Sequence, residues 1–359
     1  MPRRSAAPGA SREDILMRPL NLFERAALGG MCVVMTAGSL AAQPGGAGAA
    51  AGDYLGMPSP GSEPAVFAPG VVSTGLGERD MAITPDGNEI YYTTYVGRYV
   101  FSAIMMVRRV GGSWQSPEVA PFSGLPGVLD GEPAISPDGK RFFFLSNRPS
   151  RPGAEPNEDI WVMERTADGW GAPANLGAPV NSAAKEYFPS LTRDGTLYFT
   201  REGDPNNPNG IYRARLLDGK YAEIERLPDI VNAGKECFNA FIAPDESFLI
   251  YSIYGRKDSV GSVDYYVSFR SPDDAWSEPI NLGPKVNTKG GEEYAPYVSL
   301  DGRYFFFMSS RTQAAKELFG ERVTAAALQR LATLPGNGAA DVWWVDASFL
   351  QRLKPKPTP

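Results

Sequence analysis

The chain alternates polar turns with short runs of aromatic and β-branched residues, and one such unit recurs five times. The turns at 84–87 and 136–139 are Thr-Pro-Asp-Gly and Ser-Pro-Asp-Gly, and aromatic runs follow at 89–94 and 141–146. Pro presets the first turn position, Asp binds its own backbone and Gly adopts the left-handed conformation, so the pattern predicts a hairpin between two antiparallel strands. The turn aspartates, separated by 52, 56, 51 and 56 residues, are Asp86, Asp138, Asp194, Asp245 and Asp301.

Two more strands are expected in each unit. A third strand, again rich in aromatic and β-branched residues, is clearest at 159–163, 264–267 and 341–345. A Trp-x-x-Pro motif follows in three units, and because proline cannot donate to a strand ladder, the motif predicts an outermost edge strand. Four antiparallel strands in a period of about 50 residues are typical of a β-propeller blade. The motif occurs at Trp114/Pro117, Trp170/Pro173 and Trp276/Pro279.

The spacing of these motifs also predicts how the ring closes. Each outer-strand proline stands 21 or 22 residues before the next turn aspartate, and Pro64 stands 22 residues before Asp86. Residues 62–72 are therefore expected to form an outer strand ahead of the first blade, and no such strand follows the last unit. Completing the last blade with an N-terminal strand hides the sheet edges. The sequence thus predicts an all-β, five-bladed β-propeller over residues 54–350, with four antiparallel strands per blade.

The segments outside the propeller carry separate predictions. Residues 1–41 resemble a secretory signal peptide that is cleaved after Ala41, and the Gly/Ala/Pro-rich residues 42–53 are expected to be a flexible linker. An uncleaved anchor is the alternative, but the apolar run at 26–42 is short and rich in glycine. Within an insertion at 312–340, the apolar residues of 316–334 are spaced as on one face of a helix. Residues 351–359 are expected to be a tail. We expect an exported monomer, periplasmic or extracellular, with no transmembrane span after cleavage.

Charge and composition exclude several functions. The chain has 35 Lys and Arg against 41 Asp and Glu, a net charge of -6, which argues against nucleic acid as a partner. It has no His, so His-dependent nucleophiles and His-containing metal sites are excluded. After cleavage Cys237 is the only thiol, and without a His it is not expected to be catalytic. We expect no cofactor and no metal site, and the Asn/Pro-rich segment 204–210 is interpreted as a turn.

With these repeats the chain resembles the exported TolB-type, WD-like β-propeller repeats of bacteria. The resemblance rests on SPDGKRFFFLSNRP at 136–149, WGAPANLGAPVN at 170–181 and WSEPINLGPKVN at 276–287. It covers residues 54–350 and is specific for the type of repeat. The resemblance implies a platform for binding or scaffolding more often than an enzyme, because a fold of this kind does not determine a function.

Two columns of repeat positions, charged except for Cys237, are expected at one face of the propeller. One column stands eight residues before each turn aspartate, and the other stands at or just beyond the end of each second strand. The loops that lead into the first strands and those after the second strands share this loop-rich face, whereas the Asp-Gly hairpins lie on the opposite face. The columns are Glu78, Asp130, Glu186, Cys237 and Glu293, and Arg98, Arg148, Arg201, Arg256 and Arg311.

Three interpretations of these columns remain open. Each Arg can simply pair with a nearby acid, which is the usual role of repeated charges. The charged residues can instead form a binding funnel for a glycan, a cell-wall fragment or a protein partner. A carboxylate-dependent glycoside hydrolase or lyase is the third possibility, with Asp130, Glu132, Glu186 and Glu293 as candidate acids. We favour non-catalytic binding, and the predicted binding residues are Glu78, Arg79, Asp80, Asp130, Glu132, Arg148, Lys185, Glu186, Tyr187, Arg201, Glu236, Arg256, Glu293, Tyr294 and Arg311.

Overall fold

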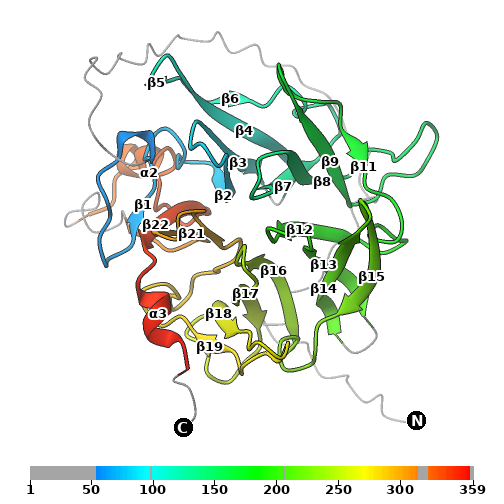
Figure 1. The fold of residues 1–359 in the computed structure, drawn as a ribbon. Helices are drawn as coiled ribbons and strands as arrows, with labels where there is room; N and C mark the ends of the chain where they lie inside the picture. The colour runs from blue at the N-terminus through cyan, green and yellow to red at the C-terminus, as the bar shows by residue number, and fades with distance from the viewer. Residues whose placement is uncertain (1–53, 98, 205–206, 314–321, 356–359) are drawn as a thin grey trace, which may run out of the picture. The chain divides into compact units, whose positions relative to one another are not determined.

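The computed structural model describes residues 54–97, 99–204, 207–313 and 322–355. These residues form five small antiparallel sheets arranged as a five-bladed β-propeller, as the sequence predicted (Figure 1). The predicted signal peptide, its cleavage site and the linker lie in residues 1–53, outside the described residues. Within those described ranges, no helix is long and apolar enough to cross a membrane.

In the first two blades the outer strand is broken into two short pieces. Pro117 and Pro173 stand directly before the second piece. The strand breaks there because a proline has no N–H to donate to the ladder. The predicted second strand at 141–146 is confirmed residue for residue as β8. The strands are β2 (Gly77–Ile83), β3 (Glu89–Val96), β4 (Phe101–Val110), β5 (Ser113–Trp114), β6 (Glu118–Val119), β7 (Asp130–Ile135), β8 (Arg141–Ser146), β9 (Asp159–Thr166), β10 (Gly169–Trp170) and β11 (Ala174–Asn175).

The third blade differs because its outer strand has no proline. Ile224 occupies the position that proline takes in the other Trp-x-x-Pro blades, and the outer strand β15 runs unbroken for seven residues. In the fourth blade Pro279 again limits the outer strand, β19, to two residues. The strands are β12 (Glu186–Leu191), β13 (Leu197–Asp204), β14 (Asn207–Leu217), β15 (Lys220–Arg226), β16 (Glu236–Ile242), β17 (Phe248–Tyr254), β18 (Val263–Phe269) and β19 (Ile280–Asn281).

The fifth blade is completed by the N-terminal strand, as predicted. Ala65 of β1 pairs with Trp344 of β22, and these two strands lie side by side in Figure 1. Next to this strand Phe67 is fully buried, with its ring 5.0 Å from that of Phe306 and 5.2 Å from that of Trp344. The strands, in sheet order, are β1 (Ala65–Val66), β22 (Asp341–Asp346), β21 (Tyr304–Ser309) and β20 (Tyr297–Val298).

A turn with an aspartate joins the first and second strands of each blade, with Glu246 in place of glycine in the fourth, and the aspartate side chain accepts hydrogen bonds within the turn. Asp86 Oδ1 accepts hydrogen bonds from Thr84 Oγ1 at 2.6 Å and from the Asn88 N–H at 3.1 Å. In the fourth blade alanine replaces the hydroxyl residue, and Ser247 Oγ donates to Asp245 Oδ1 at 2.6 Å instead. Backbone geometry thus accounts for the turn residues.

The few helical elements lie outside the blades. The expected helix within 316–334 is observed as α2 (Ala325–Leu331), whose N-terminal N–H of Ala327 donates to Thr324 Oγ1 at 3.1 Å. Residues 314–321 lie outside the described residues. Helix α3 (Phe349–Leu353) runs past residue 350, where the propeller was expected to end, and Leu350 packs into the core of the last two blades. A 3₁₀ turn, η2 (Tyr54–Gly56), precedes β1.

Candidate functional site

The inner strand of every blade has a backbone distortion at the same repeat position. Six residues before each turn aspartate, a residue other than glycine has a φ of 50–68°. The strand register shifts at this position in the first four blades, which is the mark of a β-bulge that redirects side chains. Such strained conformations often occur at functional sites. The five residues are Asp80, Glu132, Phe188, Asn239 and Ala295.

Arg79, beside the first of these bulges, lies at the centre of a buried charged cluster. Its side chain is 8% exposed, and its Nη2 lies 2.9 Å from Glu132 Oε1 and its Nε 3.2 Å from Asp80 Oδ2. The rings of Tyr99 and Tyr294 lie 5.0 and 5.4 Å from the guanidinium carbon, which is close enough for cation–π attraction. One cation therefore holds two carboxylates and connects the first blade to the second.

Glu132 also links the second blade to the third. Its Oε2 accepts a hydrogen bond from the Phe188 N–H at 2.7 Å, so both of its oxygens are engaged. The pKa of Glu132 is raised to about 7, chiefly by burial and also by the charge of Asp80, while Arg79 and the Phe188 N–H oppose the rise. The carboxyl group of Glu132 thus changes its charge near neutral pH.

Asp80 is the least satisfied member of the cluster. The residue is 3% exposed, and apart from the contact with Arg79 Nε neither carboxylate oxygen has a hydrogen-bond partner of good geometry among the described residues. Burial raises the pKa of Asp80, and the positive charge of Arg79, the nearby Thr93 hydroxyl and the Glu132 N–H oppose that rise. With both acids ionised, the two carboxylates and one guanidinium carry a net charge of -1.

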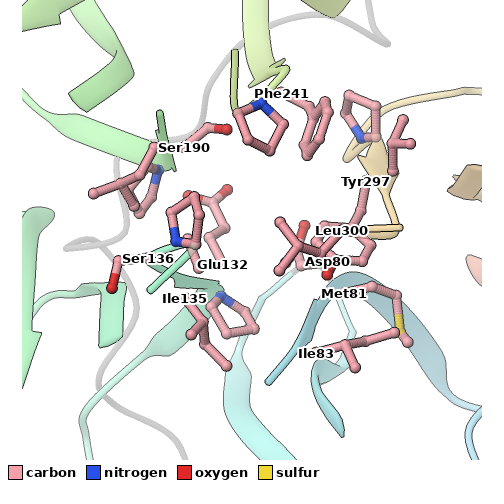
Figure 2. A pocket seen from close by; sticks show the side chains of 18 of the residues that line it. Asp80, Met81, Ile83, Glu132, Ile135, Ser136, Ser190, Phe241, Tyr297 and Leu300 are labelled. Atoms are coloured by element: carbon pink, nitrogen blue, oxygen red, sulfur yellow. The ribbon is translucent and has the colours of Figure 1, made fainter. Parts of the chain in front are cut away.

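Asp80 and Glu132 line a pocket at the hairpin end of the propeller's central channel (Figure 2). Its empty volume, including the part open to solvent, is about 640 Å³. Inner strands of all five blades contribute, and Pro85, Pro137 and Pro244 of the hairpin turns stand at the rim. The other side chains that surround the opening are mainly apolar. Those labelled in Figure 2 include Met81, Ile83, Ile135, Phe241, Tyr297 and Leu300.

The charged columns predicted for the loop-rich face form buried pairs within the blades. Arg148 Nη2 lies 2.8 Å from Asp130 Oδ1, and Arg201 Nε lies 2.7 Å from Glu186 Oε1. Each guanidinium also stacks over an aromatic ring of the third strand, with Arg148 5.5 Å from the ring centre of Trp161. These contacts match the structural interpretation of the columns.

Two further arginines of the second column, Arg311 and Arg256, are also engaged. Arg311 donates to backbone carbonyls of Lys285 and Val286 and stacks over Trp343, whereas Arg256 pairs with Asp258 at 2.9 Å. Arg98 lies outside the described residues.

The acids of the first column hold the loops that lead into the inner strands. Glu78 accepts from the N–H and hydroxyl of Thr74, and Glu293 accepts from the Thr288 hydroxyl at 2.6 Å. Burial raises the pKa of both Glu78 and Glu293. In the fourth blade the buried Cys237 takes the same place, and burial raises the pKa of its thiol to about 12, so it holds its proton at neutral pH.

Three predicted residues at the loop-rich mouth form polar contacts between neighbouring loops. Tyr187 donates its hydroxyl to Asn209 Oδ1 at 3.0 Å, and Asn209 donates to Glu236 Oε2 at 2.9 Å. Lys185 Nζ lies 3.2 Å from Glu158 Oε1 and 3.8 Å from Glu202 Oε2.

The structure therefore regroups the predicted site residues. Arg79, Asp80, Glu132 and Tyr294 come together in the channel, whereas Asp130 is held apart from Glu132 by its pair with Arg148. The sequence analysis missed Tyr99 and the apolar residues of the pocket. The recurrence of a positive φ six residues before each turn aspartate is the signal that marks the channel position, and only backbone angles reveal it.

Neither a scan of protein-family models nor a search of curated proteins finds a match. Solved structures similar to this chain include TolB from Acinetobacter baumannii, at 16% identity and a TM-score of 0.41, covering 76% of this chain and 57% of that one. A putative TolB from Agrobacterium tumefaciens matches at 15% identity and a TM-score of 0.42, over 65% of this chain and 70% of that one. An arabinanase from Bacillus subtilis matches at 13% identity and a TM-score of 0.46, over 79% and 97%. Likeness at this level concerns the fold alone.

Proposed function

We propose that this protein is a non-catalytic binding propeller whose ligand occupies the pocket at the hairpin end of the channel. The observation that carries the proposal is the state of the two acids that line that pocket. Arg79 contacts both of them, and Glu132 has its second oxygen on a backbone N–H. Glycoside hydrolysis needs one carboxyl group free to give a proton and another free to attack or to activate water. Acids held in this way suit recognition better than turnover.

The proposal moves the ligand from the loop-rich face to the hairpin face. The Arg and acid residues of the columns that the structure describes are occupied in contacts within the blades, and the pocket with the two channel acids opens between the hairpin turns. In keeping with the predicted signal peptide, we place the protein outside the cytoplasm. Its ligand is then a molecule of the cell envelope, such as a glycan, a cell-wall fragment or a peptide.

A binding array of glycans, peptidoglycan fragments and peptides, followed in parallel for released products, tests this function. We expect retention of a ligand without product. Leu300→Trp, at an exposed rim position, should weaken retention, whereas Lys185→Ala at the loop-rich mouth should not. Loss of binding in the Lys185 variant alone would return the site to the loop-rich face.

A carboxylate-dependent hydrolase is the second candidate, and one observation favours it. A carboxyl group with a pKa of about 7, as in Glu132, suits a general acid at neutral pH. Under this alternative the array releases product, and Glu132→Gln abolishes the release. Product formation that depends on Glu132 would overturn the binding proposal.

A further inference from the structure

The pocket combines two acidic side chains, Asp80 and Glu132, with a mainly apolar wall. Asp80 and Glu132 share one guanidinium, so the buried cluster is one positive charge short of neutrality when both are ionised. The two oxygens of Asp80 are buried and make no hydrogen bond of good geometry within the described residues, although the Thr93 hydroxyl and the Glu132 N–H lie near enough to lower its pKa. Buried carboxylates are normally paired or hydrogen-bonded, so this one is poised to accept a donor that carries a positive charge.

We propose that the pocket binds a primary ammonium group carried on an apolar chain, with the ammonium against Asp80 and the chain along the pocket wall. This inference rests on the proposed function and names the class of its ligand. A primary ammonium supplies one charge and three donors, which matches both the missing charge and the unsatisfied oxygens. An anion would face two carboxylates, and a divalent cation would face the guanidinium of Arg79, which already contacts both acids.

The wall of the pocket determines the rest of the ligand. Aliphatic and aromatic side chains surround the opening, among them Ile83, Ile135, Leu191 and Phe241. Six prolines also line it, and a proline has no backbone N–H to offer. A ligand body rich in hydroxyl groups would lose its hydrogen bonds to water without replacing them, whereas an alkyl chain gains from burial. The prolines are Pro85, Pro133, Pro137, Pro189, Pro244 and Pro296.

Titration calorimetry of the purified protein with hexylammonium chloride tests this inference at pH 8, above the pKa of about 7 of Glu132. Hexanol and sodium hexanoate have the same chain without the positive charge and serve as ligand controls. Asp80→Asn is the informative variant, because Asn tolerates the left-handed backbone of this position and leaves Arg79 paired with Glu132 in a neutral cluster. Glu118→Gln removes an exposed acid that does not line the pocket and serves as the matched control.

We expect hexylammonium to bind more tightly than hexanol and hexanoate, and Asp80→Asn to weaken it by about ten-fold or more, since a hydrogen bond to a charged group is lost. The Glu118 variant should bind as the parent does. A lysine-containing peptide and its acetylated form then distinguish a protein side chain from a free amine as the source of the ammonium. Equal binding to the Asp80 variant, or equal binding of hexanoate, would overturn the inference.

Failure of this inference can be told apart from failure of the proposed function. If the array yields a ligand that Leu300→Trp weakens, but hexylammonium does not bind, the binding function stands and the ammonium assignment is wrong. If the array yields product that depends on Glu132, the binding function itself is wrong. A folded Asp80→Asn variant, checked by its thermal midpoint, ensures that lost binding reports on the carboxylate.

Discussion

Arg79 Nη2 lies 2.9 Å from Glu132 Oε1, and this contact joins the inner strands of the first and second blades within the channel. Glu132 also connects the second blade to the third, because its second oxygen accepts a hydrogen bond from the Phe188 N–H. Three blades are therefore tied by one buried ion pair and one hydrogen bond. The same carboxyl group lines the pocket, so stability and recognition depend on shared atoms.

Replacing Arg79 with Met should destabilise the protein strongly at neutral pH. The change leaves two buried carboxylates without their cation, and breaking a buried pair in this way costs about 3–5 kcal/mol. Chemical denaturation at pH 7.5 measures the loss. Arg108→Met is the control, because the pair of Arg108 with Glu118 is exposed and should contribute about 1 kcal/mol or less. Equal losses in the two variants would show that the channel pair is not structural.

The stability of the channel cluster should fall as pH rises through neutrality. The folded pKa of Glu132, about 7, is above its ordinary value of 4.5, so between these values the folded state holds more protons than the unfolded state. Stability is then greatest below pH 4.5 and is lost as pH approaches 7 and beyond, by up to about 3 kcal/mol. The pKa of Asp80 is also raised, and its titration is linked to that of Glu132. The positive charge of Arg79 opposes both rises in pKa.

The Glu132→Gln variant isolates this effect. Its free energy of unfolding is compared with that of the parent at several pH values between 4.5 and 8. Four turn aspartates, Asp86, Asp138, Asp194 and Asp245, have lowered pKa values; they contribute equally to both proteins and cancel in the difference. We expect the parent to lose stability relative to the variant as pH rises. A difference that stays constant over this range would contradict the assignment.

Arg148→Leu should cost more stability than Arg256→Leu. The side chain of Arg148 is 11% exposed and pairs with a fully buried Asp130, whereas Arg256 pairs with Asp258, whose side chain is 49% exposed. Removing Arg148 leaves Asp130 buried without its cation, at a cost of about 3 kcal/mol or more, and removing Arg256 should cost about 1 kcal/mol. Thermal and denaturant midpoints measure both. Ligand binding by a folded Arg148 variant should persist, and its loss would favour a site on the loop-rich face.

A chain that begins at residue 75 should fail to fold, whereas one that begins at residue 52 should fold. The shorter chain lacks β1 and leaves the edge of β22 unpaired. It also lacks Phe67, which is fully buried against Phe306 and Trp344. Phe67→Ala in the full chain should itself cost about 3–5 kcal/mol. Thermal melts compare the chains, and equal midpoints would refute closure of the ring by the N-terminal strand.

The repeat, the blade and the closing strand follow from local chemistry. A Pro-Asp-Gly turn, an aromatic run and a proline at the edge each impose a backbone geometry that does not depend on distant residues. Strand β8 therefore matches its prediction at both ends. The spacing of Pro64 from Asp86 was enough to predict that residues 62–72 close the last blade, although the strand itself, β1, covers only Ala65–Val66. The unbroken β15 likewise follows from Ile224 in place of proline.

The roles of the charged residues were decided by the tertiary structure alone. Glu132 and Asp130 are two residues apart, yet one lines the channel pocket and the other pairs inside its blade with Arg148. Glu132 has a left-handed backbone conformation that redirects the strand after Asp130. The partners of Glu132, Arg79 and the Phe188 N–H, come from other blades, so its burial and its charge pairing depend on contacts across more than fifty residues. The sequence alone determined which acids exist and how often they recur. The closed ring decided which of them meet Arg79 and face the pocket.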